Sequence, residues 1–197
     1  VIHLEKGRII ADTPDVDLAI GAYLSQNDPR AGAAWHNDGT LLANEVITPL
    51  SFTITDGRGQ ILERPLGSDE PLAVHIEFDA KTISGNLAVG YALYDALGNM
   101  LYWSYQGDST AFDYGTLKPG RNHIVSLIPP NLLNDGGYTA QLTIGLMGDR
   151  ALLSRETSPV KVAFEISGNL RRASYWVDRR NTLIAPVLQW DTEEVKS

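Results

Sequence analysis

The 197-residue chain contains no cysteine, and this absence limits the chemistry that it can perform. Without thiols the chain forms no disulfide, no thiolate zinc site and no cysteine nucleophile. A chain without cysteine also fits a reducing compartment.

Long hydrophobic runs and an excess of positive charge are missing as well. No apolar segment approaches the ~18 residues of a membrane-spanning helix. Sixteen lysines and arginines stand against 24 aspartates and glutamates, which gives a formal net charge of −8. Because duplex nucleic acids are bound through basic patches, we expect no nucleic-acid partner. Residue 1 is valine rather than methionine, so we expect the chain to be part of a longer protein.

Enzyme motifs are not found either. The chain has no phosphate-binding loop of the form GxxxxGK[ST] and no GxSxG nucleophile turn. The four histidines lack the HExxH or HxH spacing that directs two ligands to one metal. We therefore expect a non-catalytic protein without metal or cofactor, in which His75 and His123 point outward from strands as solvent-facing or hydrogen-bonded side chains.

The first 26 residues differ from the rest of the chain in their sequence pattern, which predicts a hairpin and a helix. Residues 1–10 predict a short hairpin with its turn at Lys6-Gly7. Thr13 can cap the helix that follows, and Pro14 suits its first turn. Apolar residues then recur with helical spacing from 16 to 24. Residues 27–44, rich in glycine, alanine and asparagine, predict a linker.

From residue 45 the apolar period changes from helical to two. Short alternating segments separated by Gly, Pro, Asn and Asp turns are typical of an antiparallel β-sandwich, which we predict over residues 45–168 within a domain of 45–197. Its core is expected to contain Val74, Ile76, Phe78, Val89, Tyr91, Leu93, Leu142, Ile144, Val162 and Phe164. Residues 182–190 predict one last strand, and Pro186 favours an edge position for it.

One predicted hairpin suggests a binding surface. Alternation assigns Ala88, Gly90, Ala92 and Tyr94 to the face opposite the core, which would form a shallow floor of small residues beside an aromatic wall. Pyranose rings pack their C–H faces on aromatic rings, and polar groups then bind their hydroxyls. We expect such polar groups nearby from Tyr102, Gln141 and Thr143.

Other interpretations of these residues stay open. The tyrosines can instead support sheet pairing alone. A sugar terminus with a negative charge would require cations or histidines, for which Arg121, His75 and His123 are the candidates. A second place for the site is offered by the segments that carry Trp35, His36, Tyr175 and Trp176.

The order of motifs along the chain resembles the C-terminal domain of Wzt proteins, the ATPase subunits of ABC exporters for O-antigen polysaccharide. The resemblance rests on Glu45-Val46-Ile47, Ile54-Thr55-Asp56-Gly57-Arg58-Gly59, Ser68-Asp69-Glu70-Pro71-Leu72, Val89-Gly90-Tyr91-Ala92-Leu93-Tyr94-Asp95 with Gly98, and Leu132-Leu133-Asn134-Asp135-Gly136-Gly137-Tyr138. The family often has glycine where this chain has Asp69, and arginine where it has Tyr94. Residues 1–26 resemble the last hairpin and helix of the ATPase domain.

This resemblance implies an immunoglobulin-like β-sandwich that binds the non-reducing terminus of a finished polysaccharide in the cytoplasm. The domain is expected to form a homodimer, with a possible exchange of the last strand, and to reach the transporter's membrane subunit through the parent chain. Two other functions stay open: a purely structural dimerisation domain of the ATPase, and an accessory module or hydrolase of a secreted enzyme.

Overall fold

The computed structural model describes residues 2–5, 8–12, 14, 32–167, 182 and 184–186. The predicted hairpin is present, as β1 (Ile2–Glu5) pairs antiparallel with β2 (Arg8–Asp12). Apart from Pro14, the helix predicted after it lies outside the described residues, as do Tyr175 and Trp176. Among the described residues no helix is long and apolar enough to cross a membrane.

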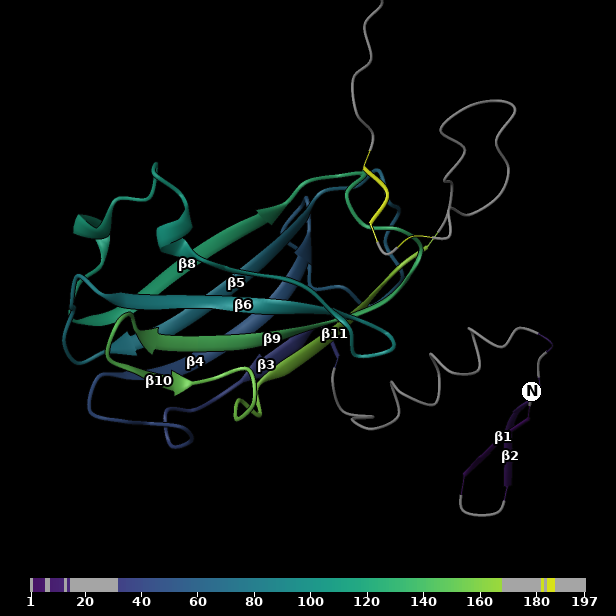
Figure 1. Ribbon diagram of the computed structural model, residues 1–197, viewed down its shortest axis with the longest axis horizontal. Helices are drawn as coiled ribbons and strands as arrows, with labels where there is room; N and C mark the ends of the chain where they lie inside the picture. The colour runs from purple at the N-terminus through teal and green to yellow at the C-terminus, as the bar shows by residue number, and fades with distance from the viewer. Residues whose placement is uncertain are drawn as a thin grey trace, which may run out of the picture.

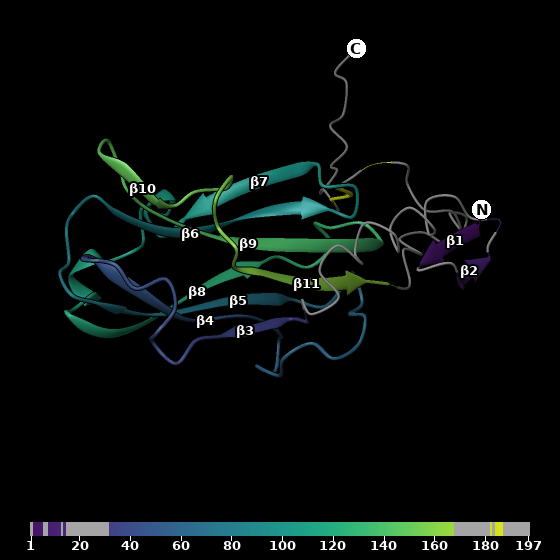
Figure 2. The ribbon, with the colours of Figure 1, turned by 90° about the horizontal axis from the view of Figure 1, so that it is seen from below.

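Residues 32–167 form a β-sandwich of two antiparallel sheets, as predicted (Figures 1 and 2). The four-stranded sheet has the order β3 (Ala34–His36), β4 (Ile47–Asp56), β5 (Leu72–Ala80), β8 (Gly120–Ile128). The five-stranded sheet has the order β10 (Arg150–Leu153), β9 (Gly136–Leu146), β6 (Leu87–Asp95), β7 (Met100–Tyr105), and β11 (Lys161–Ile166) also pairs with β9. Two short 3₁₀ turns, η1 (Gln106–Asp108) and η2 (Tyr114–Thr116), join β7 to β8.

The core lies between the two sheets, as Figure 2 shows edge-on. All ten residues predicted for the core are buried, because alternation along each strand sends every second side chain inward. Tyr91 spans the layers: its hydroxyl lies 3.3 Å from Ser126 Oγ on β8 of the opposite sheet. Tyr138 and Phe164 stack within the core with ring centroids 5.5 Å apart.

Two tight turns at different places in the chain are stabilised by the same kind of hydrogen bond, from backbone N–H groups to an aspartate carboxylate. The Asp56 carboxylate accepts hydrogen bonds from the backbone N–H groups of Arg58 and Gln60. The Asp95 carboxylate likewise accepts from Leu97 and Asn99. Gly59 and Gly98, three residues after each aspartate, have φ values of +79° and +80°, which favour glycine. The D-x-x-G spacing in the sequence is therefore the signature of these turns.

The four-stranded sheet begins before the predicted boundary at residue 45. β3 lies within the segment expected to be a linker, and Ala33 beside it is buried. The carbonyl of Ala33 accepts from Ile54 N on β4, and the carbonyl of Gly32 accepts from Ala163 N on β11. Residues 32–36 therefore connect to both sheets.

The described part of the predicted last strand contacts the loop before β9. Ile184 forms an isolated antiparallel bridge with Leu133, and the buried Ala185 donates its N–H to the Leu132 carbonyl at 2.9 Å. The side-chain amide of Asn134, itself fully buried, donates to the carbonyl of Thr182 at 2.7 Å. Residues 187–190 lie outside the described part.

Candidate functional site

The outer side of the four-stranded sheet carries a cluster of polar side chains, which we call the polar face. Cross-strand register aligns them in rows: His36, Ser51, Glu77 and His123 face one another across the sheet, and Thr53, His75 and Val125 form the next row. The face comprises Ala34, His36, Thr48, Ser51, Thr53, Thr55, Ala73, His75, Glu77, Asp79, Arg121, His123, Val125 and Leu127.

Three side chains of the polar face form one hydrogen-bonded chain across β4, β5 and β8. Thr55 Oγ1 lies 3.0 Å from His75 Nε2, and His75 Nδ1 lies 3.0 Å from His123 Nε2. The two imidazole rings are nearly parallel, with centroids 5.2 Å apart. A hydrogen bond between two ring nitrogens needs a lone pair on one of them, so at least one of the two rings is neutral.

The environment of His75 favours its neutral form. Partial burial lowers the pKa of His75 below its ordinary value of 6.5, the neighbouring His123 lowers it further, and Glu77 opposes both effects. A neutral imidazole offers one donor and one acceptor. Near pH 7 His75 therefore acts as a hydrogen-bonding group rather than as a cation.

Glu77 and Arg121 form an ion pair beside this chain. Arg121 donates from Nε and Nη2 to the same Glu77 oxygen, Oε2, at 3.2 and 2.5 Å. The hydrogen bond from Arg121 is the main reason that the pKa of Glu77 lies below its ordinary value. The other carboxylate oxygen, Oε1, makes no hydrogen bond to the described residues, so it is available as an acceptor.

Exposed apolar side chains lie next to these polar groups. Val125 faces His75 across the strand pair and is 50% exposed, while Leu127 on the same strand is 75% exposed. Planar donors and acceptors beside small apolar surfaces match the two kinds of surface that a sugar presents, hydroxyl groups and C–H faces.

The predicted floor of small residues is not accessible, and the prediction of an open surface there is wrong. Ala88, Gly90 and Ala92 do lie on the outer side of the five-stranded sheet, but all three are buried. The connection from β10 to β11, residues 154–160, covers this side: the Arg155 guanidinium lies 4.4 Å from the ring centroid of Trp103 on β7.

The glycine at position 90 has a structural cause rather than a role in a binding floor. A Cβ atom on Gly90 would lie 1.9 Å from the Ser104 carbonyl oxygen and 2.8 Å from Tyr105 Cα. The backbones of β6 and β7 approach so closely here that no larger residue fits.

Gln141 and Thr143 share the covered side and are also buried, with exposed fractions of 4% and 1%. The Gln141 amide donates to the Ser158 carbonyl at 2.7 Å and so holds the β10–β11 connection against the sheet. Thr143 Oγ1 has no hydrogen-bond partner among the described residues. Tyr94, the predicted aromatic wall, is half-buried opposite Thr139.

Tyr102 faces the core instead of the outer side where it was predicted. It pairs with the buried Leu93, its ring meets that of Tyr91 edge-on at 6.1 Å, and the two hydroxyls lie 3.4 Å apart. Burial raises the pKa of Tyr102 above its ordinary value, so its hydroxyl stays neutral.

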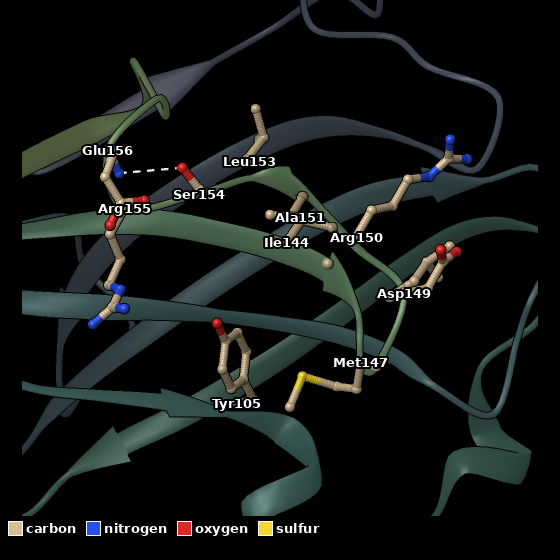
Figure 3. Close-up of a pocket in the computed structure, with 13 residues that line it drawn as sticks. Tyr105, Ile144, Met147, Asp149, Arg150, Ala151, Leu153, Ser154, Arg155 and Glu156 are labelled. Atoms are coloured by element: carbon tan, nitrogen blue, oxygen red, sulfur yellow. Dashed lines mark hydrogen bonds between the residues drawn. The ribbon is translucent and has the colours of Figure 1, made fainter.

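A pocket of about 380 Å³ lies on the outer side of the five-stranded sheet, beside the β9–β10 turn (Figure 3). In this view Tyr105 and Met147 lie at the bottom of the pocket, with Arg155 at the left and Arg150 and Asp149 at the right. Its lining also includes the small residues Gly145, Gly148 and Ala151. Tyr105 was not among the predicted site residues.

The nine predicted site residues therefore divide among three places. Gly90, Ala92, Tyr94, Gln141 and Thr143 lie on the covered side, and Tyr102 faces the core. Only His75, Arg121 and His123 come together on an accessible surface, with Glu77, Thr55 and His36 as neighbours that were not assigned to the site. Alternation along residues 72–80 and 120–128 would have indicated that Glu77 shares a face with His75. The described residues contain no group of three or more His, Asp or Glu side chains able to hold a metal ion.

Comparison with known proteins supports the fold assignment. No protein-family model and no curated protein sequence match the chain. Among solved structures it is similar to the crystal structure of the C-terminal domain of Wzt, with a TM-score of 0.51 and 11% sequence identity, over 84% of this chain and 90% of that chain. At this level of identity the similarity shows a shared all-β, immunoglobulin-like sandwich fold.

Proposed function

We propose that this chain is a non-catalytic carbohydrate-binding domain that binds the terminus of an O-antigen-type polysaccharide and so selects finished chains for export by an ABC transporter. The fold similarity to the Wzt C-terminal domain supports this class of function. The parent chain would act at the cytoplasmic face of the membrane and would contact the transporter's membrane subunit, with residues 1–26 as the end of an ATPase domain.

The observation that carries the proposal is the arrangement of the polar face. His123 and Glu77 present planar hydrogen-bonding groups from two neighbouring strands, beside the exposed Val125 and Leu127, and His75 holds the His123 ring in place through its hydrogen bond. The equivalent side of the other sheet is covered by residues 154–160. We therefore propose that the sugar lies on the polar face, with His75, His123 and Arg121 among its contacts.

The test is a titration of the chain with O-antigen-type polysaccharide by isothermal titration calorimetry. Because a shallow surface exchanges water contacts for sugar contacts, we expect a dissociation constant of micromolar order or weaker. The variant His123→Ala removes an exposed ring and should weaken binding about fivefold to tenfold, as expected for one lost hydrogen bond.

The matched control is Tyr105→Phe, which removes one hydroxyl from the pocket on the other sheet and should leave binding unchanged. A loss of binding in Tyr105→Phe with normal binding in His123→Ala would assign the sugar-binding site to that pocket and not to the polar face. Failure of the unmodified chain to bind any polysaccharide would contradict the proposed function itself.

A second candidate function is structural dimerisation of the transporter ATPase without glycan binding. It is favoured by β8, which lies at the edge of its sheet and exposes Val125 and Leu127. An exposed strand edge can pair with a second copy. The segment 182–190 is the other expected contact of a homodimer.

Light scattering separates the two dimer contacts. Loss of the dimer on removal of residues after Arg180, but not in Leu127→Asp, would assign the interface to the C-terminal segment, and the reverse result would assign it to β8. A dimer that binds no glycan would favour the structural function, whereas a monomer in the unmodified chain would exclude it.

A further inference from the structure

The charges on the polar face compensate one another, and this balance bears on the kind of sugar that the face can bind. Of its fourteen positions only Arg121 is a lysine or arginine, and both of its hydrogen-bonding contacts go to Glu77. Asp79 pairs directly with Arg121 in the β5–β8 register and adds a second carboxylate. One guanidinium therefore faces two carboxylates.

The hydrogen-bonded histidine pair carries at most one positive charge. The hydrogen bond between His75 Nδ1 and His123 Nε2 requires a lone pair on one ring, so the two rings cannot both be imidazolium while it is present. His36 on β3 lies in the same row as Glu77 and His123, and Ser51 on β4 separates it from Glu77. The one lysine or arginine of the face is therefore already paired with a carboxylate, and no second one is present among the fourteen positions to meet an anionic ligand.

A carboxylate or phosphate on the ligand would therefore lose water contacts without meeting an unpaired lysine or arginine, and it would lie close to Glu77 and Asp79. A sugar hydroxyl, in contrast, finds hydrogen-bond partners on this face. Carboxylate oxygens accept hydrogen bonds from sugar hydroxyls, and Glu77 Oε1 makes no hydrogen bond to the described residues. The second ring nitrogen of His123, Nδ1, makes no hydrogen bond to the described residues and can donate to or accept from a hydroxyl, whereas both nitrogens of His75 are engaged with Thr55 and His123.

Building on the proposed carbohydrate-binding function, we propose that the polar face selects an uncharged sugar terminus and discriminates against a terminus that carries a carboxylate or phosphate. Arg121 then lies at the edge of the sugar site as a positioning residue: it fixes the Glu77 carboxylate and does not bind an anionic cap. Selectivity then comes from the negative charge of the face, since repulsion of a wrong ligand is as effective as attraction of the right one.

The test uses a glycan array of matched pairs, in which each neutral terminal hexose is accompanied by its hexuronic acid and by its phosphorylated form. At pH 7.5 and low salt we expect the neutral member of each bound pair to bind about tenfold more tightly than its acidic partners. The negative charge of an acidic sugar would be repelled by the nearby carboxylates of Glu77 and Asp79, and repulsion between close like charges weakens binding by about this factor. The difference should shrink in 0.5 M salt, where exposed charges are screened.

The variant Glu77→Gln sharpens the test. It removes one carboxylate and frees the Arg121 guanidinium, so binding of the acidic members should increase about tenfold and the preference should narrow or reverse. The control Glu165→Gln makes the same change of charge on an exposed residue of β11, in the other sheet, and should leave the preference unchanged. Glu77 is in a surface ion pair, so its loss should affect folding little.

The outcomes separate this inference from the function on which it rests. Preferential binding of the acidic members by the unmodified chain would overturn the inference and leave the carbohydrate-binding function standing. A preference that is equal in Glu77→Gln and Glu165→Gln would also overturn it, because the polar face would then not be the origin of selectivity. No binding to any member, neutral or acidic, would contradict the proposed function and this inference together.

Discussion

The two sheets of the sandwich have outer sides of opposite character. The outer side of the five-stranded sheet carries small residues, Ala88, Gly90 and Ala92, and is covered by the connection between β10 and β11. The outer side of the four-stranded sheet carries larger polar residues. Those of β4 are buried, whereas Asp79 on β5 and Arg121 and His123 on β8 are exposed. Small side chains on a strand therefore indicated here a close approach of other protein segments, and not an open floor for a ligand.

The comparison also separates two uses of polar side chains. On the covered side, the Gln141 amide bonds the Ser158 carbonyl and serves the fold. On the polar face, His75 bonds both the buried Thr55 and His123, and the exposed His123 ring lies where a ligand can reach it. Four predictions test this difference.

The largest effect is expected for Gly90→Ala. The added Cβ would collide with the Ser104 carbonyl oxygen and Tyr105 Cα, so β6 and β7 must separate. We expect the free energy of unfolding, measured by urea denaturation, to fall by about 3 kcal/mol, as for an overpacked core. The control Gly137→Ala places its Cβ no closer than 3.7 Å to a neighbour and should change stability little. Equal stability of the two variants would show that β6 and β7 are not so closely apposed.

The next effect is expected for Gln141→Ala. The variant loses the hydrogen bond to Ser158 and leaves a buried carbonyl group without its donor, which should lower the free energy of unfolding by about 2 kcal/mol. Amide exchange in residues 154–160 should become faster, because this bond holds them to the sheet. An unchanged thermal midpoint would contradict the buried hydrogen bond and would indicate that Gln141 is exposed, as alternation alone suggested.

A smaller effect of opposite sign is expected for Thr143→Val. The Thr143 hydroxyl is buried, and no described residue hydrogen-bonds with it, so a methyl group of similar size removes a desolvation cost. The free energy of unfolding should increase by about 1 kcal/mol in the same urea measurement. A decrease would reveal a hydrogen-bond partner for this hydroxyl.

The smallest effect is a pH dependence that originates at the polar face. Because the pKa of His75 is below 6.5 in the folded chain, the unfolded chain binds a proton first as the pH falls through 6.5. The free energy of unfolding should therefore decrease between about pH 7 and the folded pKa, and change no further below it. The titratable groups that act on this ring are His123, which lowers its pKa further, and Glu77, which opposes the shift.

The variant His75→Gln removes this titration and should show a flatter stability curve over the same range. The carboxylates with lowered pKa values, which include Asp56 and Glu77, act in a separate window, because their contribution is lost only as the pH falls below about 4. Parallel curves for the unmodified chain and His75→Gln between pH 7 and 5 would contradict the shift at His75.

The sequence by itself determined the elements and the core of the sandwich. Alternation from Leu72 to Phe78 and from Leu87 to Leu93 depends only on the two-residue period of a strand, so the inward side chains were predictable. The turns at Asp56 and Asp95 were predictable too, because a carboxylate that caps its own turn and a glycine three residues later act locally.

Only the tertiary structure decided which residues meet on a surface. His75 and His123 are 48 residues apart, and they meet because β5 lies next to β8. Nothing in the local pattern around Ala92 indicated that residues 154–160 would cover it, since that cover depends on Arg155 and Ser158 reaching the sheet from a distant connection. Period and turn chemistry act between neighbours in the chain, whereas strand order and the covering of an outer face depend on contacts between residues far apart in it.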